Sequence, residues 1–366
     1  MRRLIIKSVL IIIALSLLIS GCTPSKQTIK DNFYSYQQMT AEISTLASRY
    51  PQILSVHEIA KTYEGRSIII LEIGNKTGKA DKSGLMATFA QHSGEHATTK
   101  TGMGFVKLLL SNYGMDADIT KLLDEKTVYI APMVNPDGVD YDLNSDEPPF
   151  NWRKNRKPVG SNIYGVDLNR NWGYHWDAPT TDAFAKSMNT PDDQYYHGDH
   201  PFSETETKML SAFISSHKNI KLFVDYHTGT STFMQGDILI PFSYTEDQEF
   251  NQQELAKYEF ISNKLCEIIN DPNDKRAPYA AMRTYKIKEF VFKQTPLLQK
   301  PFVWLSLPSS TLAPGAAIDW AASQGMIALG IEMACDDNFV SNMPASQENL
   351  TKNQFKGFLF LIAQSP

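Results

Sequence analysis

The sequence contains few of the features that mark nucleic-acid-binding, repetitive or multidomain proteins. It has no excess or stripe of basic residues, since 35 lysines and arginines stand against 40 acidic residues and the formal net charge is −5. This balance argues against nucleic acid as a partner. No Pro/Gly/Ser-rich linker, internal repeat or low-complexity stretch divides the chain after its first 30 residues. Because 42% of the residues are hydrophobic, enough for a large core, we predict one domain over residues 31–366.

A hydrophobic run long enough to cross a membrane is also missing. The longest apolar stretch, residues 9–19, is shorter than the ~20 residues of a transmembrane helix. It follows a positive segment at residues 2–7 and leads into an Ile-Ser-Gly-Cys sequence that ends at Cys22. This pattern is typical of a signal peptide, and its end resembles the bacterial lipobox. We predict a signal peptide over residues 1–21, a lipid on Cys22 and a tether over residues 22–30, which would hold an exported chain on a bacterial membrane in the cell envelope. An uncleaved signal anchor is the alternative.

Cysteine is scarce, with three residues in the chain. With Cys22 assigned to the lipid, Cys266 and Cys335 remain. Two thiols of an exported protein can pair, and each can equally be a small buried apolar residue. The sequence leaves both alternatives open.

Short apolar runs alternate with longer amphipathic segments, which is typical of an α/β protein. The expected strands are residues 67–73, 85–90, 126–133, 221–226 and 326–333. The expected helices are residues 98–113, a helix opened by a Ser203/Glu206 capping box and ending near residue 217, residues 251–270 and residues 349–363. Such alternation implies a mainly parallel sheet covered by helices on both faces. Ligands of such sheets bind beyond the carboxyl ends of the strands.

Two histidines and two glutamates fall at those strand ends. His92 and Glu95 follow one expected strand, His227 follows another, and Glu332 ends the last. A single histidine at a strand end is most often structural, but two imidazoles and a carboxylate are a common ligand set for a catalytic zinc that keeps one position open. A further carboxylate can take the proton of an attacking water. The grouping therefore indicates a hydrolytic zinc site.

Further motifs are spread along the chain in a fixed order. They are Glu64-Gly65-Arg66, Asn135-Pro136-Asp137-Gly138, Trp152-Arg153-Lys154, Asp167-Leu168-Asn169-Arg170, Tyr196-His197-Gly198, Asp225-Tyr226-His227 and Ile318-Asp319-Trp320. Together with the strand-end residues they resemble the zinc metallocarboxypeptidases related to pancreatic carboxypeptidase, from about residue 34 to about residue 334. The resemblance implies an α/β fold with a mainly parallel, mixed sheet of about eight strands flanked by helices on both faces.

By position, the resemblance assigns the metal site. It implies one zinc ion per chain, bound by His92, Glu95 and His227. Glu332 matches the general base that activates the attacking water. Asp167 matches a carboxylate that orients the first zinc histidine.

The resemblance also assigns the substrate contacts. Arg153 matches the arginine that stabilises the developing oxyanion. Asn169 and Arg170 match the pair that holds the terminal carboxylate, which suits a planar guanidinium. Arg156 is expected to add positive potential along the subsite, and Ile318 to form the base of the pocket for the C-terminal side chain. Without the resemblance, both Arg153 and Arg156 would be read as surface charges and Ile318 as a core residue.

The chain departs from the family at the substrate lid. The lid tyrosine is replaced by Thr311, which keeps a hydroxyl but no ring. The Gln-His-Ser-Gly-Glu sequence around His92 is similar to bacterial branches of the family, some of which cleave cell-wall peptides.

We therefore expect a zinc peptidase that releases C-terminal apolar or aromatic residues from peptides with a free carboxylate in the envelope. A muropeptide peptidase or amidohydrolase is the first alternative, and a catalytically inactive binding module the second. The sequence predicts no oligomeric state.

Overall fold

The computed structural model describes residues 30–77, 82–145, 152–180, 182–228, 236–245, 249–270, 280–283, 312–333 and 343–366. The predicted signal peptide, Cys22 and nearly all of the tether lie outside these residues and stay predictions. No helix in the described ranges is both long enough and apolar enough to cross a membrane.

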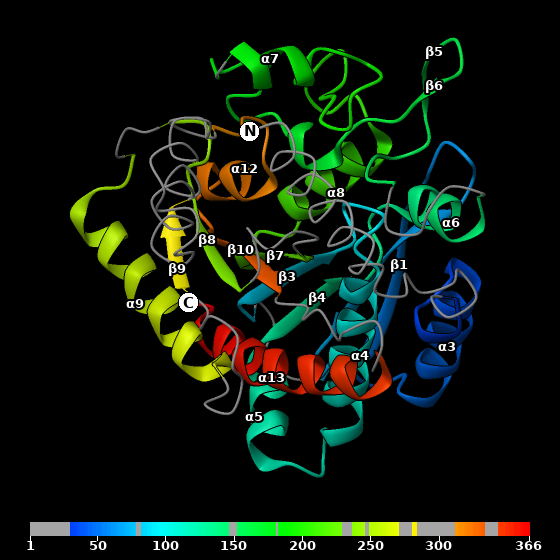
Figure 1. Cartoon of the computed structure of the whole chain (residues 1–366). Helices are drawn as coiled ribbons and strands as arrows, with labels where there is room; N and C mark the ends of the chain where they lie inside the picture. The colour runs from blue at the N-terminus through cyan, green and yellow to red at the C-terminus, as the bar shows by residue number, and fades with distance from the viewer. Residues whose placement is uncertain are drawn as a thin grey trace, which may run out of the picture.

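A mixed sheet of eight strands forms the centre of the described structure (Figure 1). The strands are β1 (Leu54–Lys61), β2 (Ser67–Ile73), β3 (Gly84–Phe89), β4 (Thr127–Ala131), β7 (Ile220–Thr228), β8 (Asp237–Ile240), β9 (Ala280–Arg283) and β10 (Ile327–Met333). Their order is β1-β2-β4-β3-β7-β10-β8-β9. The four central neighbours β4, β3, β7 and β10 run parallel, while β2 and β8 flank them antiparallel. A separate two-stranded sheet joins β5 (Pro158–Gly160) to β6 (Ile163–Tyr164).

Helices cover both faces of the sheet. They are α3 (Tyr36–Arg49), α4 (His96–Asn112), α5 (Ala117–Glu125), α6 (Pro136–Asn144), the 3₁₀ turn η1 (Leu168–Arg170), α7 (Asp182–Met188), α8 (Thr205–Ser216), α9 (Gln252–Ile269), α12 (Ala317–Ser323) and α13 (Met343–Gln364). Figure 1 shows α4 and α13 on one side of the central strands and α8 and α12 on the other. Each side has its own apolar core.

The alternation of side chains along a strand explains these two cores. In β7, Leu222 and Val224 contribute to the first core with α4, α9 and α13, whereas Phe223 contributes to the second with α8 and α12. Because β7 is buried on both faces, its sequence is apolar throughout its centre. His227 shares the parity of Phe223, so it faces the α8/α12 side at the carboxyl end of the strand.

The expected strands and helices are confirmed, with small shifts at their ends. The final helix begins at Met343 and not at residue 349. The capping-box prediction is wrong: Glu204 is the N-cap of α8, and its side chain makes no cap hydrogen bond. Ser203 Oγ instead donates to Glu204 Oε1 (2.8 Å) and accepts from Asn171 Nδ2 (2.9 Å).

One of the two remaining cysteines can be placed. Cys266 is a free, buried thiol on α9, where it packs in the first core as a small apolar residue. Cys335 lies outside the described residues.

Candidate active site

The three predicted metal ligands converge at the carboxyl ends of β3 and β7. The Nδ1 atoms of His92 and His227 lie 3.1 Å apart. The Glu95 carboxylate lies 2.8 Å from Nδ1 of His92 and 3.1 Å from Nδ1 of His227. All three residues are buried. Ligands of a tetrahedral zinc lie about 3.3 Å from one another, so this donor set fits the ion that the sequence predicts.

A tight turn brings His92 and Glu95 to the same point. Ala90 follows β3 with a positive φ of 52°, a conformation that redirects the chain out of the strand. Thr98 fastens the turn, because its Oγ1 accepts from Ala90 N (3.0 Å) and donates to Glu95 O (2.7 Å). Glu95 is then the N-cap residue of α4.

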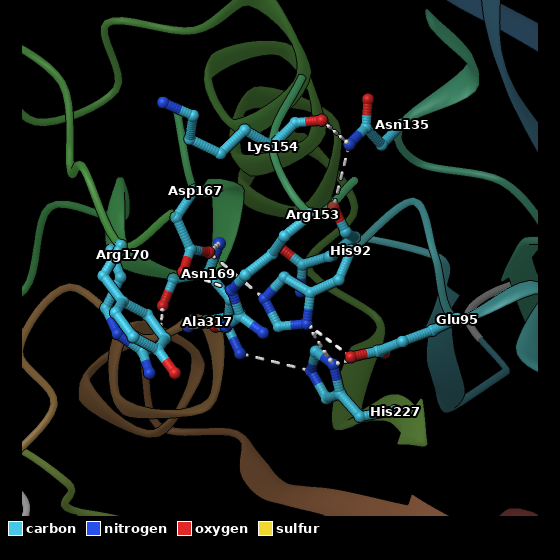
Figure 2. A network of polar contacts seen from close by, with 12 residues as sticks. His92, Glu95, Asn135, Arg153, Lys154, Asp167, Asn169, Arg170, His227 and Ala317 are labelled. Atoms are coloured by element: carbon cyan, nitrogen blue, oxygen red, sulfur yellow. Dashed lines mark hydrogen bonds and ion pairs between the residues drawn. The ribbon is translucent and has the colours of Figure 1, made fainter. Parts of the chain in front are cut away.

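A carboxylate holds the far side of the first histidine, as predicted. Asp167 Oδ1 lies 3.1 Å from Nε2 of His92, and Asp167 Oδ2 accepts from Nε of Arg153 (2.8 Å). Figure 2 shows both side chains reaching this carboxylate. Burial alone raises the pKa of Asp167, but Arg153 and His92 hold it well below its usual range. Asp167 therefore stays ionised and links His92 to Arg153.

A second carboxylate, which the sequence analysis did not assign, holds the other histidine. Asp225 Oδ2 lies 2.7 Å from Nε2 of His227, and Asp225 is fully buried. A sequence signal was present, because residues two apart in a strand point to the same face. An acid two positions before a strand-end histidine is therefore placed to contact it.

Glu332 lies beside His227, as predicted, because β10 pairs with β7 in parallel with these two residues in register. Its side chain is buried, and burial raises the pKa of the Glu332 carboxyl to about 8, against the opposing effect of the His227 ring. Burial thus gives this carboxyl a higher proton affinity than an exposed glutamate has, which suits a group that takes up a proton during a reaction.

The two arginines of the predicted substrate contacts are each backed by an aromatic ring. The Arg153 guanidinium lies 5.2 Å from the ring centre of Tyr195, and that of Arg170 lies 5.7 Å from Phe184. Arg170 Nη1 donates to Asn169 O (2.6 Å). Its buried Nε has no hydrogen-bond partner among the described residues, which leaves donor capacity for a ligand.

Asn169 uses its side-chain amide within the protein. Its Oδ1 accepts from Ala317 N (2.9 Å), and its Nδ2 lies 3.2 Å from Nε2 of His227. It therefore joins η1 to the start of α12 and to the metal site (Figure 2). Its contact with a substrate carboxylate stays a prediction.

The other predicted substrate residues are not brought to the metal group in the same way. Arg156 lies among the rings of Tyr141, Trp152 and Tyr164, at 3.7, 4.7 and 4.3 Å from their centres. Ile318 is buried in the second core, on α12. Thr311 lies outside the described residues. Their contacts with substrate stay predictions.

Comparison with known proteins agrees with this geometry. The sequence profile of the zinc carboxypeptidase family matches residues 39–355. Carboxypeptidase A1 of Rattus norvegicus is 29% identical over 295 residues, which are 80% of this chain and 60% of the relative. Carboxypeptidase A1 of Sus scrofa is 28% identical over 318 residues, 86% of this chain and 65% of the relative. The chain thus spans between 60% and 65% of the length of these relatives.

Solved structures share the fold. Thrombin-activatable fibrinolysis inhibitor aligns with a TM-score of 0.73 at 21% identity over 91% of this chain and 74% of that one. Carboxypeptidase A from Helicoverpa armigera aligns with a TM-score of 0.69 at 21% identity over 96% and 79% of the two chains.

Proposed function

The chain belongs to the zinc carboxypeptidase family, and we propose that it is a zinc-dependent peptidase that releases C-terminal residues from peptides with a free carboxylate. The observation that carries this proposal is the convergence of His92, Glu95 and His227, all buried, on one point beside Glu332. A decayed site that only binds ligands would be expected to have lost one of these four groups.

Each group of the site has a task in hydrolysis. A bound zinc ion supplies Lewis acidity at the scissile bond. Glu332 takes the proton of the attacking water and passes it to the leaving amine. Arg153, oriented by Asp167, donates to the oxygen on which negative charge develops, a contact worth about 3 kcal/mol in comparable sites. Arg170 pairs with the terminal carboxylate.

The side chain that the enzyme releases is apolar or aromatic in this proposal. Ile318 lies in an apolar cluster on α12, the helix whose first residue, Ala317, is bonded to Asn169. Burial of a Phe or Leu side chain in a pocket is worth ~1.5–3 kcal/mol. An ammonium group against Ile318 would lose its hydration without gaining a partner.

The proposed setting is the cell envelope, with the chain held on a membrane through a lipid on Cys22. The support is the sequence alone: a short apolar run that ends at a Gly-Cys pair. Peptides and muropeptides in the envelope both offer a free carboxylate near a scissile bond.

A hydrolysis panel tests the proposal. Purified zinc-loaded protein is given blocked dipeptides ending in Phe or Lys, the C-terminal amide of the Phe substrate, and a muropeptide. We expect the Phe dipeptide to be cleaved faster than the Lys dipeptide, weak cleavage of the amide, and loss of activity with a chelator that zinc restores. Cleavage of the muropeptide alone would favour the alternative function, a peptidase of cell-wall peptides. Cleavage of none of the four by zinc-loaded protein would contradict a peptidase function.

A further inference from the structure

A buried chain of hydrogen bonds leads from an indole to the second metal histidine. Its members are Trp172, Gln91, Asp225 and His227, with Thr88 as a side branch, and all but His227 are fully buried. His227 is 3% exposed. No hydrolytic step described above uses Gln91, Thr88 or Trp172.

Trp172 fixes the orientation of the Gln91 amide, and with it the direction of both hydrogen bonds that this amide makes. Trp172 Nε1 can only donate, and it donates to Gln91 Oε1 (3.1 Å). The other end of the Gln91 amide must then be its NH₂ group, which donates to Asp225 Oδ2. Thr88 Oγ1 donates to Asp225 Oδ1 (2.7 Å). Asp225 is therefore held as an acceptor at both oxygens.

An accepting Asp225 determines which nitrogen of His227 carries the proton. Its Oδ2 lies 2.7 Å from His227 Nε2, so Nε2 must be the protonated, donating nitrogen. Asn169 Nδ2 also lies 3.2 Å from Nε2 and would require an unprotonated nitrogen. The contact with Asp225 is shorter and charge-assisted, and it prevails. With Nε2 protonated, Nδ1 presents its lone pair to Glu95 and His92, where the metal binds.

We propose that Asp225 and Gln91 are positioning residues for the metal, and that they hold His227 in the tautomer that binds zinc through Nδ1. Gln91 precedes His92 in the chain, so it also ties the segment that carries the first histidine to the carboxylate behind the second. The inference rests on the zinc site of the proposed function but not on its substrate. Zinc binding therefore tests it separately from peptide hydrolysis.

Asp167 and Asp225, the carboxylates that contact the two metal histidines, differ in their other hydrogen-bond partners. Asp167 also orients Arg153, so its removal disturbs metal and oxyanion contacts together. Among the described residues, the Asp225 carboxylate hydrogen-bonds to Thr88, Gln91 and His227, and none of these is an arginine of the predicted substrate contacts. Loss of Asp225 is thus expected to weaken zinc binding, while the KM of the zinc-saturated enzyme for substrate stays close to the wild-type value.

The first experiment measures zinc affinity of the full chain by competition with a chromophoric chelator. Asp225→Asn is expected to weaken zinc binding by about 10–100-fold. Asp142→Asn is the matched control, because Asp142 lies 2.6 Å from Nε2 of another buried histidine, His96, outside the metal group. The control is expected to lose thermal stability and to keep its zinc affinity. Equal zinc affinity in Asp225→Asn and wild type would overturn the proposal.

A charge-swapped variant separates positioning from packing. In Gln91→Glu/Asp225→Asn, the carboxylate introduced at position 91 accepts from Trp172 and from the amide introduced at position 225, and Thr88 still donates to the oxygen of that amide. Every one of these hydrogen bonds is satisfied and the net charge is unchanged, but the amide nitrogen now faces His227 Nε2 and requires it to be unprotonated. We expect the zinc-free swap variant to melt closer to wild type than Asp225→Asn does, and its zinc affinity to remain about 10–100-fold weaker. Wild-type zinc affinity in the swap variant would show that Asp225 and Gln91 contribute to zinc binding only through packing, and that they do not set the tautomer of His227.

Discussion

Glu206 is a buried acid with no ion-pair partner in the part of the chain that the structure describes, and its charge is expected to destabilise the protein at alkaline pH. It lies in the first turn of α8 and is 2% exposed. The nearby Lys157 pairs with Glu204 Oε1 (3.1 Å), and Asn155 Nδ2 donates to Glu204 Oε2 (2.7 Å) while it lies 3.4 Å from both oxygens of Glu206. Burial therefore raises the pKa of Glu206 to about 8.

The sign and size of the effect follow from proton linkage. The folded protein holds this proton up to a pH of about 8, whereas the unfolded chain releases it near 4.5. The stabilising contribution of the neutral carboxyl is thus complete below the unfolded pKa and is lost as the pH rises through the folded one. At 1.36 kcal/mol per pKa unit, the loss between pH 6 and pH 9 is roughly 2–3 kcal/mol.

Glu206→Gln removes the titration and keeps the shape of the side chain. The free energy of unfolding is measured by urea denaturation of both proteins at pH 6 and pH 9 with the same total zinc. The advantage of the variant over wild type should grow by roughly 2–3 kcal/mol between the two values. Glu267→Gln is the control, because Glu267 is exposed on α9 beside Lys264, and its effect should stay within about 0.5 kcal/mol at both pH values. An advantage for Glu206→Gln that does not change with pH would refute the reasoning.

Three further predictions concern catalysis and location. Glu332→Gln should retain its zinc, measured by metal analysis, and lower kcat by about 10²–10⁴-fold because the general base is lost; near wild-type turnover would exclude this role. Ile318→Asp should shift kcat/KM toward substrates ending in Lys relative to Phe, and an unchanged ratio would show that Ile318 does not set specificity. Cys22→Ala should abolish metabolic labelling with a fatty acid, and persistent labelling would place the lipid on another residue.

Much of the fold and the metal site was predictable because the apolar runs of the central strands end where the candidate metal ligands and the general base begin. Those strands are buried on both faces and read as continuous apolar runs, so their ends and the polar residues beyond them stand out. His92, His227 and Glu332 were found in this way. Parallel neighbours then bring their carboxyl ends to one edge, which explains why the residues meet.

The missed features depend on contacts that local patterns do not contain. Ser203 stands where the sequence pattern predicts a helix cap, but its hydroxyl hydrogen-bonds to Asn171 and Glu204 instead of to the helix backbone. Arg156 would be taken for a surface charge from its own segment alone, yet three rings from separate segments surround it; its subsite role stays a prediction. Asp225 had a usable signal in its spacing from His227. The link from Asp225 to Gln91, which lies 134 residues away, could come only from the structure.

The separation of the two metal histidines along the chain affects how the protein acquires its zinc. His92 and His227 are 135 residues apart, and they approach each other only when β3 and β7 have paired. A loop of this length must close before the full set of three ligands exists, so we expect zinc to bind the assembled sheet and not to template the early steps of folding. Zinc instead selects the assembled sheet and stabilises it in proportion to the logarithm of its concentration. Metal added before refolding should therefore leave the folding rate unchanged and slow the unfolding rate. Bound zinc would then lengthen the lifetime of the folded protein without speeding its formation.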